Sequence, residues 1–193
     1  MQTILYWSHT KWLVHALTVM PTHVHVLATP LESARGEWYS LSEILHSIER
    51  ASARSINLAR GVQGPVWSTE SYDRIIRSER EWSATFDYIL HNAMDDGYEG
   101  DPYAYDGFWC EGMEAPPGEH GGPPMAEHPA DERSTGGVMP RISAGSFVQR
   151  RRYLPHWESP GASYHVVFGL RGHRASPDLP EQILGRRMRG PIP

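Results

Sequence analysis

Two histidines two residues apart in an apolar run are the first feature of this chain that can carry chemistry. The run is Thr18-Val19-Met20-Pro21-Thr22-His23-Val24-His25-Val26-Leu27. Successive side chains of a β-strand point to opposite faces, so His23 and His25 would share one face and the two valines the other. Neutral imidazole is a good ligand for divalent ions, and two such rings can share an ion when a third ligand comes from elsewhere. The alternative is an ordinary histidine pair on a solvated sheet face, because short motifs often match by chance.

A tyrosine and an asparagine downstream form the second candidate group. Ser78 followed by Glu81 is a capping-box pattern, which predicts a helix that begins there and runs to about Asp96, before a glycine. The spacing of apolar residues predicts its buried stripe, which is Trp82, Phe86, Ile89 and Ala93. Tyr88 and Asn92 lie one turn apart on the flank of that stripe. Taken alone, they would be interpreted as a half-buried packing residue and a solvated amide.

Four motifs in the first half of the chain carry a resemblance to a known family. They are Val19-Met20-Pro21-Thr22-His23-Val24-His25-Val26-Leu27, Gly64-Pro65-Val66-Trp67, Tyr72-Asp73-Arg74-Ile75-Ile76-Arg77 and Tyr88-Ile89-Leu90-His91-Asn92. In this order and at about this spacing across residues 3–98, they resemble the REP-associated tyrosine transposases, a branch of the single-tyrosine HUH transposases. The resemblance implies an α+β fold, the HUH endonuclease fold, in which helices pack on a ferredoxin-like antiparallel sheet.

The resemblance also implies an activity and roles for particular residues. Members of the family cleave and rejoin single-stranded, hairpin-bearing DNA. Matched by motif, Tyr88 would be the nucleophile that forms a covalent phosphotyrosine link. His23, His25 and Asn92 would hold a divalent ion, Mg²⁺ or Mn²⁺. Many members act as dimers, so the resemblance implies a homodimer as well.

Two other interpretations remain open. The chain has Thr22 where members usually have asparagine, and Ala93 where they usually have proline. Neither residue is a ligand in the family, so these departures affect positioning, and they favour a DNA-hairpin-binding protein that keeps the fold without transposition. A small metal hydrolase built on the two histidines is a third interpretation. It would leave Tyr88, Asn92 and the arginine distribution without a role.

The composition predicts one domain with a moderate core. The chain has 193 residues, of which 39% are hydrophobic. It has no apolar run of about 18 residues and no basic leader before an apolar stretch, so we predict neither a membrane span nor a signal peptide. A single cysteine, Cys110, excludes an internal disulfide and fits a reducing compartment. With DNA as the partner, these features predict a cytoplasmic, nucleoid-associated protein.

The net charge of −5 is unexpected for a DNA-binding protein, but the charge is unevenly distributed. Residues 95–132 hold 11 acidic residues and no lysine or arginine, which leaves 12 acidic and 18 basic residues elsewhere. A basic remainder with clustered arginine is typical of DNA binding. The arginines predicted to contact phosphates are Arg50, Arg54, Arg74, Arg77, Arg150, Arg151 and Arg152. Arg50 and Arg54 lie on a predicted helix, and a charged helix face of this kind is also typical of an ordinary solvent-exposed surface.

The elements around these motifs are predicted in chain order. Residues 3–12 are interpreted as the last turns of a helix, and 12–19 as a strand that forms an antiparallel hairpin with the histidine strand. A helix is predicted over 41–59, and 66–76 is strand-like. The core stripe of that helix would be Leu41, Ile44, Leu45 and Ile48.

Residues 1–98 are predicted to form the main part of the domain, and residues 99–146 a linker. The linker has nine glycines and seven prolines besides its acidic bias. Such a segment buries too little apolar area to offset its ordering entropy, so we predict that it is flexible. The aromatic residues at 103–105 and 108–109 are the part of the linker that we expect to fold back onto the domain.

The segment 147–193 resembles the beginning of these transposases, although it stands at the end of this chain. An arginine-rich stretch and Leu154-Pro155-His156-Trp157 precede a strand-like run, Tyr164–Leu170, and 179–184 resembles the start of the family's first helix. We therefore predict a circular permutation, in which this segment supplies the first strand, beside the histidine strand, to the same domain. The alternative is a truncated second copy that donates its strand to a neighbouring subunit.

Overall fold

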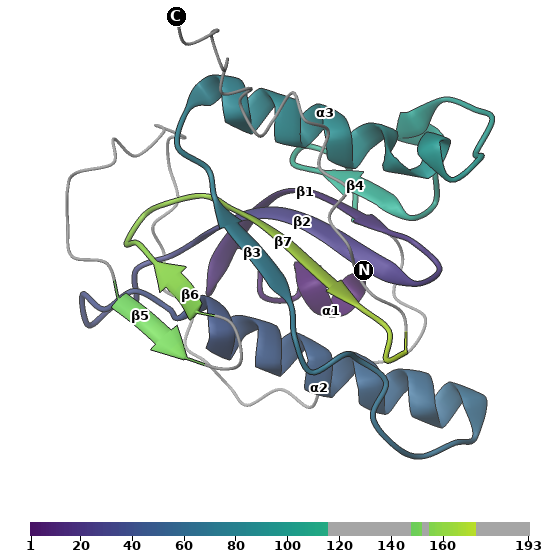
Figure 1. The fold of residues 1–193 in the computed structure, drawn as a ribbon, viewed down its shortest axis with the longest axis horizontal. Coiled ribbons are helices and arrows are strands. Elements are labelled where there is room, and N and C mark those ends of the chain that lie inside the picture. Colours follow the sequence, from purple (N-terminus) through teal and green to yellow (C-terminus); the bar gives the residue numbers. More distant parts are fainter. Residues whose placement is uncertain (116–147, 152–154, 173–193) are drawn as a thin grey trace, which may run out of the picture.

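The protein is an α+β domain built on a five-stranded antiparallel sheet (Figure 1). The computed structural model describes residues 1–115, 148–151 and 155–172. In spatial order the strands are β3 (Tyr72–Ile75), β7 (Tyr164–Gly169), β2 (His23–Pro30), β1 (Trp12–Val19) and β4 (Phe108–Cys110). Helix α3 (Glu79–Asp95) covers one face of the sheet, and α1 (Gln2–Leu5) and α2 (Leu41–Arg60) cover the other. Strands β5 (Val148–Arg151) and β6 (Pro155–Glu158) form a separate pair. None of the helices described is long and apolar enough to cross a membrane.

The predicted hairpin around the histidines is confirmed. Strands β1 and β2 pair antiparallel, with Thr18 opposite His25 and Val19 opposite Val24. The register shifts at His15, between Val14 and Ala16. An extra residue at such a bulge lets the strand keep apolar side chains on the buried face on both sides of it.

Strand β7 is an inner strand, as the sequence predicted. It pairs antiparallel with β2 on one edge and with β3 on the other. In this register Val167 lies opposite both His25 and Tyr72. Alternation along the strand places Tyr164, Val166 and Phe168 in the core beneath α2. His165 therefore points to the opposite face, where α3 lies.

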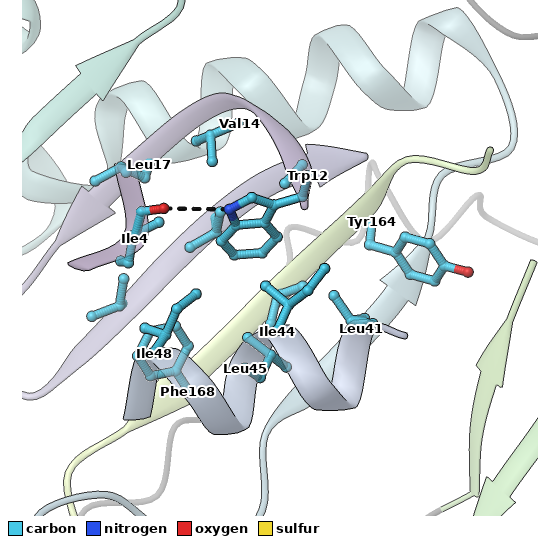
Figure 2. Packing of buried hydrophobic residues seen from close by; sticks show 14 of the residues in the cluster. Ile4, Trp12, Val14, Leu17, Leu41, Ile44, Leu45, Ile48, Tyr164 and Phe168 are labelled. Carbon is cyan, nitrogen blue, oxygen red and sulfur yellow. Dashed lines mark hydrogen bonds between the residues drawn. The ribbon is translucent and has the colours of Figure 1, made fainter. Parts of the chain in front are cut away.

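The larger core fills the space between α2 and the sheet (Figure 2). All four residues of the predicted α2 stripe are buried, and the helix ends at Gly61, whose φ of 64° is the left-handed conformation that glycine tolerates. The indole nitrogen of Trp12 donates to the carbonyl of Ile4 at 3.3 Å, which anchors α1 to β1. A smaller core lies under α3 and contains Ala16, Leu27, Ile76, Ile89, Leu90 and Phe108.

Two of the predicted elements are shorter than expected. Helix α1 ends at Leu5, and the following residues form turns in which His9 has a φ of 63°. A histidine in the left-handed region cannot continue a right-handed helix. Strand β3 spans only 72–75, and Trp67 makes an isolated bridge to Leu170.

The flexible-linker prediction is wrong for residues 99–115. A 3₁₀ helix η1 (Pro102–Ala104) and strand β4 occupy this segment, and β4 pairs antiparallel with β1. Phe108 and Trp109 are buried, and the Tyr105 hydroxyl donates to the Val19 carbonyl at 3.1 Å. The expected folding of these aromatics onto the domain is thus confirmed. Burial of Phe108 and Trp109 provides free energy that offsets the entropy lost when this glycine- and proline-rich segment becomes ordered. Residues 116–146 of the predicted linker and the predicted helix start at 179–184 lie outside the described residues.

Candidate functional site

Helix α3 carries the candidate nucleophile across the sheet face that holds the histidines. It begins as predicted, with the Ser78 hydroxyl accepting from the Glu81 backbone N–H at 3.1 Å. The Glu81 carboxylate accepts from the Arg77 backbone N–H at 3.0 Å and from Arg74 Nε at 2.6 Å. A capping-box glutamate usually returns to the cap residue itself. Here it connects the start of α3 to β3, which fixes the helix over the sheet.

The face that α3 turns towards the sheet differs from the predicted stripe in one important respect. Ile89 and Ala93 are buried as expected, whereas Trp82 and Phe86 are half-buried and stack on each other with ring centroids 5.6 Å apart. Asn92 is only 7% exposed. It is therefore not the solvated amide that an isolated helix would predict, and its polar side chain requires a partner or a ligand.

The two histidines of β2 share one face, as predicted. Their ring centroids lie 4.8 Å apart. His23 is half-buried, but His25 is only 1% exposed, because α3 and β7 cover it. The alternative of a solvated histidine pair is therefore wrong for His25.

Both rings make a hydrogen bond through Nδ1. The Nδ1 of His23 pairs with the Thr22 hydroxyl at 3.0 Å, and the Nδ1 of His25 pairs with Nε2 of His165 at 3.1 Å. A histidine that binds a metal through Nε2 usually donates its Nδ1–H to a neighbouring acceptor, which fixes the ring. The hydroxyl of Thr22 supplies such an acceptor for His23.

Three buried polar atoms in this group have no hydrogen-bond partner. They are Nε2 of His25, Nδ1 of His165 and Oδ1 of Asn92, and the Asn92 side chain lies close enough to His23 to affect its pKa. A buried unpaired polar atom costs about 1–3 kcal/mol, so such atoms in a native fold call for a ligand or water. An amide oxygen suits Mg²⁺ or Mn²⁺, whereas an imidazole nitrogen is a better ligand for divalent transition ions than for Mg²⁺. These residues therefore fit a divalent ion, with His23 as the third ligand.

The remaining candidate, Tyr88, lies directly against this group. Its ring contacts that of His25 edge-on, with centroids 5.3 Å apart, and that of His165 with centroids 5.9 Å apart. All the residues predicted for metal binding and nucleophilic attack thus lie together, although they come from β2 and α3.

Burial keeps the histidines of the site neutral. Burial, together with smaller contributions from the nearby His165 and His23, lowers the pKa of His25 to about 2. Burial also lowers the pKa of His165 to about 4, with a smaller contribution from the positive charge of Arg74. The pKa of His23 is lowered by burial, against the opposing effects of Asp96 and Asn92. Neutral imidazole is the form that binds metal ions.

The structure does not bring all the predicted phosphate-binding arginines together. Arg74 lies beside His165 in the paired strands, but its guanidinium is engaged by Glu81. Arg77 is exposed in the turn between β3 and α3. Arg50 and Arg54 lie on α2, on the opposite face of the sheet from Tyr88. A single strand bound at the site would not reach them without passing round the sheet edge. Arg150 and Arg151 belong to β5, and Arg152 lies outside the described residues.

Sequence reasoning missed His165 as a member of this group. The signal was available, because His165 alternates with the core residues Tyr164 and Val166, and an antiparallel neighbour of β2 must present it on the face of His25. Its separation of 140 residues from His25 hides this relation in the sequence.

None of the known protein families, curated proteins or solved structures compared with this chain matches it. The site therefore rests on its own geometry. Among the described residues, no cluster of three histidine, cysteine, aspartate or glutamate side chains could hold a metal ion. A metal site on β2 consequently depends on the amide of Asn92 as a ligand.

Proposed function

We propose that the protein is a metal-dependent endonuclease and strand transferase that acts on single-stranded, hairpin-bearing DNA. Tyr88 is the nucleophile, and His23, His25 and Asn92 hold the ion. The observation that carries the proposal is the pair of buried atoms without hydrogen-bond partners, His25 Nε2 and Asn92 Oδ1, beside the Tyr88 ring. If Tyr88 served only for packing, there would be no reason for these two buried atoms to lack hydrogen-bond partners.

The arrangement of the strands also supports the proposal. If β7 is counted as the first strand, β1, β2 and β3 become the second, third and fourth, and their spatial order is 4-1-3-2. A ferredoxin-like sheet, which the resemblance implies, would have this order, with β4 added at the edge. The order therefore supports a circular permutation of the transposase domain.

In the reaction, the Tyr88 hydroxyl oxygen forms a bond to a backbone phosphorus, and the bond from that phosphorus to the 3′ oxygen breaks. The products are a phosphotyrosine ester and a strand with a free 3′-hydroxyl, and the reverse attack by a 3′-hydroxyl rejoins DNA. A bound divalent ion supplies charge stabilisation at the phosphate oxygens. A phenol in water has a pKa of about 10, so the proton of the Tyr88 hydroxyl must leave as the oxygen attacks, and the departing 3′ oxygen takes up a proton to become the hydroxyl. All these residues come from one chain, so the proposal needs no second subunit.

The decisive experiment replaces the Tyr88 hydroxyl alone. Wild-type protein with Mn²⁺ and single-stranded hairpin DNA should yield a covalent protein–DNA adduct, detected as a shifted band on a denaturing gel. Tyr88→Phe should abolish the adduct, because phenylalanine keeps the ring contacts but has no nucleophilic oxygen. DNA binding, measured by fluorescence anisotropy, should change by less than about twofold, since a fold-retaining variant keeps its phosphate contacts.

Tyr103→Phe is the matched control, because Tyr103 lies on η1 and is 49% exposed. It should form the adduct at the wild-type level. An undiminished adduct in Tyr88→Phe would refute the assignment, and Tyr72 of β3 would then be the next candidate. DNA binding without any adduct in the wild type would favour the hairpin-binding interpretation.

A further inference from the structure

A hydrogen bond joins the rings of His25 and His165. Both side chains are buried, with exposed fractions of 1% for His25 and 0% for His165. The rings stack with an interplanar angle of 18°, and 3.1 Å separates Nδ1 of His25 from Nε2 of His165. Because both rings are neutral, one nitrogen of this pair donates a proton and the other accepts it.

The direction of this bond decides what His25 presents to the site. If Nδ1 of His25 donates to His165, the Nε2 of His25 carries a lone pair and can bind an ion. If His165 donates, the Nε2 of His25 carries a hydrogen and cannot bind. Each direction leaves one buried donor and one buried acceptor without a partner, namely Nε2 of His25 and Nδ1 of His165. The number of unpaired atoms is thus the same in both directions, and only the first direction leaves a lone pair on Nε2 of His25 that could bind an ion.

We infer that His165 is a positioning residue for the metal site: it accepts the Nδ1–H of His25 and so holds the Nε2 lone pair of His25 towards the ion. This inference rests on the proposed function, which supplies the ion. Thr22 has the corresponding place for the other ligand, because its hydroxyl pairs with Nδ1 of His23 as His165 pairs with Nδ1 of His25. It takes this place only because β7 pairs with β2, so the inner strand is part of the site as well as of the core.

A role of His165 as the base that deprotonates Tyr88 is a weaker explanation of the same contacts. The Nδ1 of His165 has no hydrogen-bond partner, so it does not hold the Tyr88 hydroxyl. Its Nε2 is already engaged with His25. The ring contact with Tyr88 is a packing contact at a centroid distance of 5.9 Å.

The test compares two substitutions of the same buried side chain. His165→Gln places an amide oxygen near the position of Nε2 and can still accept from His25. His165→Leu fills the space without an acceptor. We expect the Mn²⁺ dissociation constant, measured by titration calorimetry in the absence of DNA, to rise about 10–100-fold in the leucine variant, as for other partners of metal-bound histidine. The glutamine variant should recover most of that loss, to within about threefold to fivefold of wild type, because a hydrogen-bonded amide replaces the imidazole acceptor.

A spectroscopic measurement on the wild type makes the test independent of how well the variants fold. In protein labelled with ¹⁵N-histidine, a coupling across the N–H···N bond should connect the two rings without metal. Saturating Mg²⁺ should then move the His25 hydrogen fully to Nδ1. A His25 that keeps its hydrogen on Nε2 with metal present, or no coupling between the rings, would overturn the inference.

The outcomes also separate this inference from the function on which it rests. Wild-type protein that binds no Mn²⁺ would overturn the proposed metal site and the inference together. Normal Mn²⁺ binding that is equal in wild type and in a folded His165→Leu variant would overturn the inference alone.

Discussion

Replacing Phe168 by alanine tests whether β7 is an inner strand of the domain's own sheet. Phe168 lies opposite Val24 in the β2–β7 pairing and is only 1% exposed. Its ring packs edge-on against Trp67, with centroids 5.1 Å apart. The substitution keeps the backbone hydrogen bonds of the strand and removes one large side chain from the core beneath α2.

The expected loss follows from the size of that side chain. Truncation of a fully buried phenylalanine to alanine costs about 3–5 kcal/mol, because transfer energy is lost and a cavity remains. The free energy of unfolding of such domains is about 5–15 kcal/mol, so the variant should still fold but with a much smaller free energy of unfolding. At about 2–4 °C per kcal/mol for a chain of this length, Tm should fall by about 6–20 °C.

Urea unfolding monitored by tryptophan fluorescence measures the loss. The midpoint should shift to lower urea while the slope stays unchanged, since the same surface is exposed on unfolding. Arg171→Ala is the matched control. Arg171 lies just beyond β7, has an exposed side chain and donates its backbone N–H to the Val66 carbonyl. The free energy of unfolding of Arg171→Ala should therefore stay within about 0.5 kcal/mol of wild type.

A loss below about 1 kcal/mol for Phe168→Ala would refute the placement of β7 in the core. Protein concentration separates the remaining alternatives. A strand exchanged between subunits makes the unfolding midpoint rise with concentration, whereas a strand that completes its own domain gives the same midpoint throughout.

Two further predictions concern stability. Ser78→Ala should lower the free energy of unfolding by about 0.5–2 kcal/mol, because the Glu81 N–H loses its cap; equal urea midpoints for Ser78→Ala and wild type would contradict this. Metal-free protein should lose stability as the pH falls below about 6.5. In the folded protein the pKa is about 2 for His25 and about 4 for His165, below the value of about 6.5 for an unfolded histidine. Below pH 6.5 the unfolded chain therefore binds protons that the folded protein does not. Each histidine then lowers the free energy of unfolding by about 1.4 kcal/mol per pH unit. Urea midpoints that agree at pH 7.5 and 5 would contradict this.

Local patterns in the sequence were enough to predict most elements near the site. The alternation around His23 and His25 predicts their shared face, and the one-turn spacing of Tyr88 and Asn92 places both on one side of α3. The cap at Ser78 is an equally local signal. In each case the residues that set the geometry lie within a few positions of one another.

The sequence failed where the deciding contacts join distant segments. The linker prediction relied on composition, and composition cannot show that Phe108 and Trp109 find a place on the edge of β1. The burial of Asn92 depends on the sheet beneath α3, and a helix pattern alone does not reveal that sheet. The pairing of His25 with His165 depends on a strand register that no local pattern contains.

The same contrast explains why the order of the segments along the chain matters little to the site. A strand is held in a sheet by its register and by the burial of its alternating side chains, and neither depends on which end of the chain supplies it. Strand β7 satisfies both conditions between β2 and β3, and it presents His165 to His25 as a consequence. Moving the segment that contains β7 to precede residue 1 would therefore leave the contacts among His25, His165 and Tyr88 unchanged, because all of them are set by the sheet and by α3.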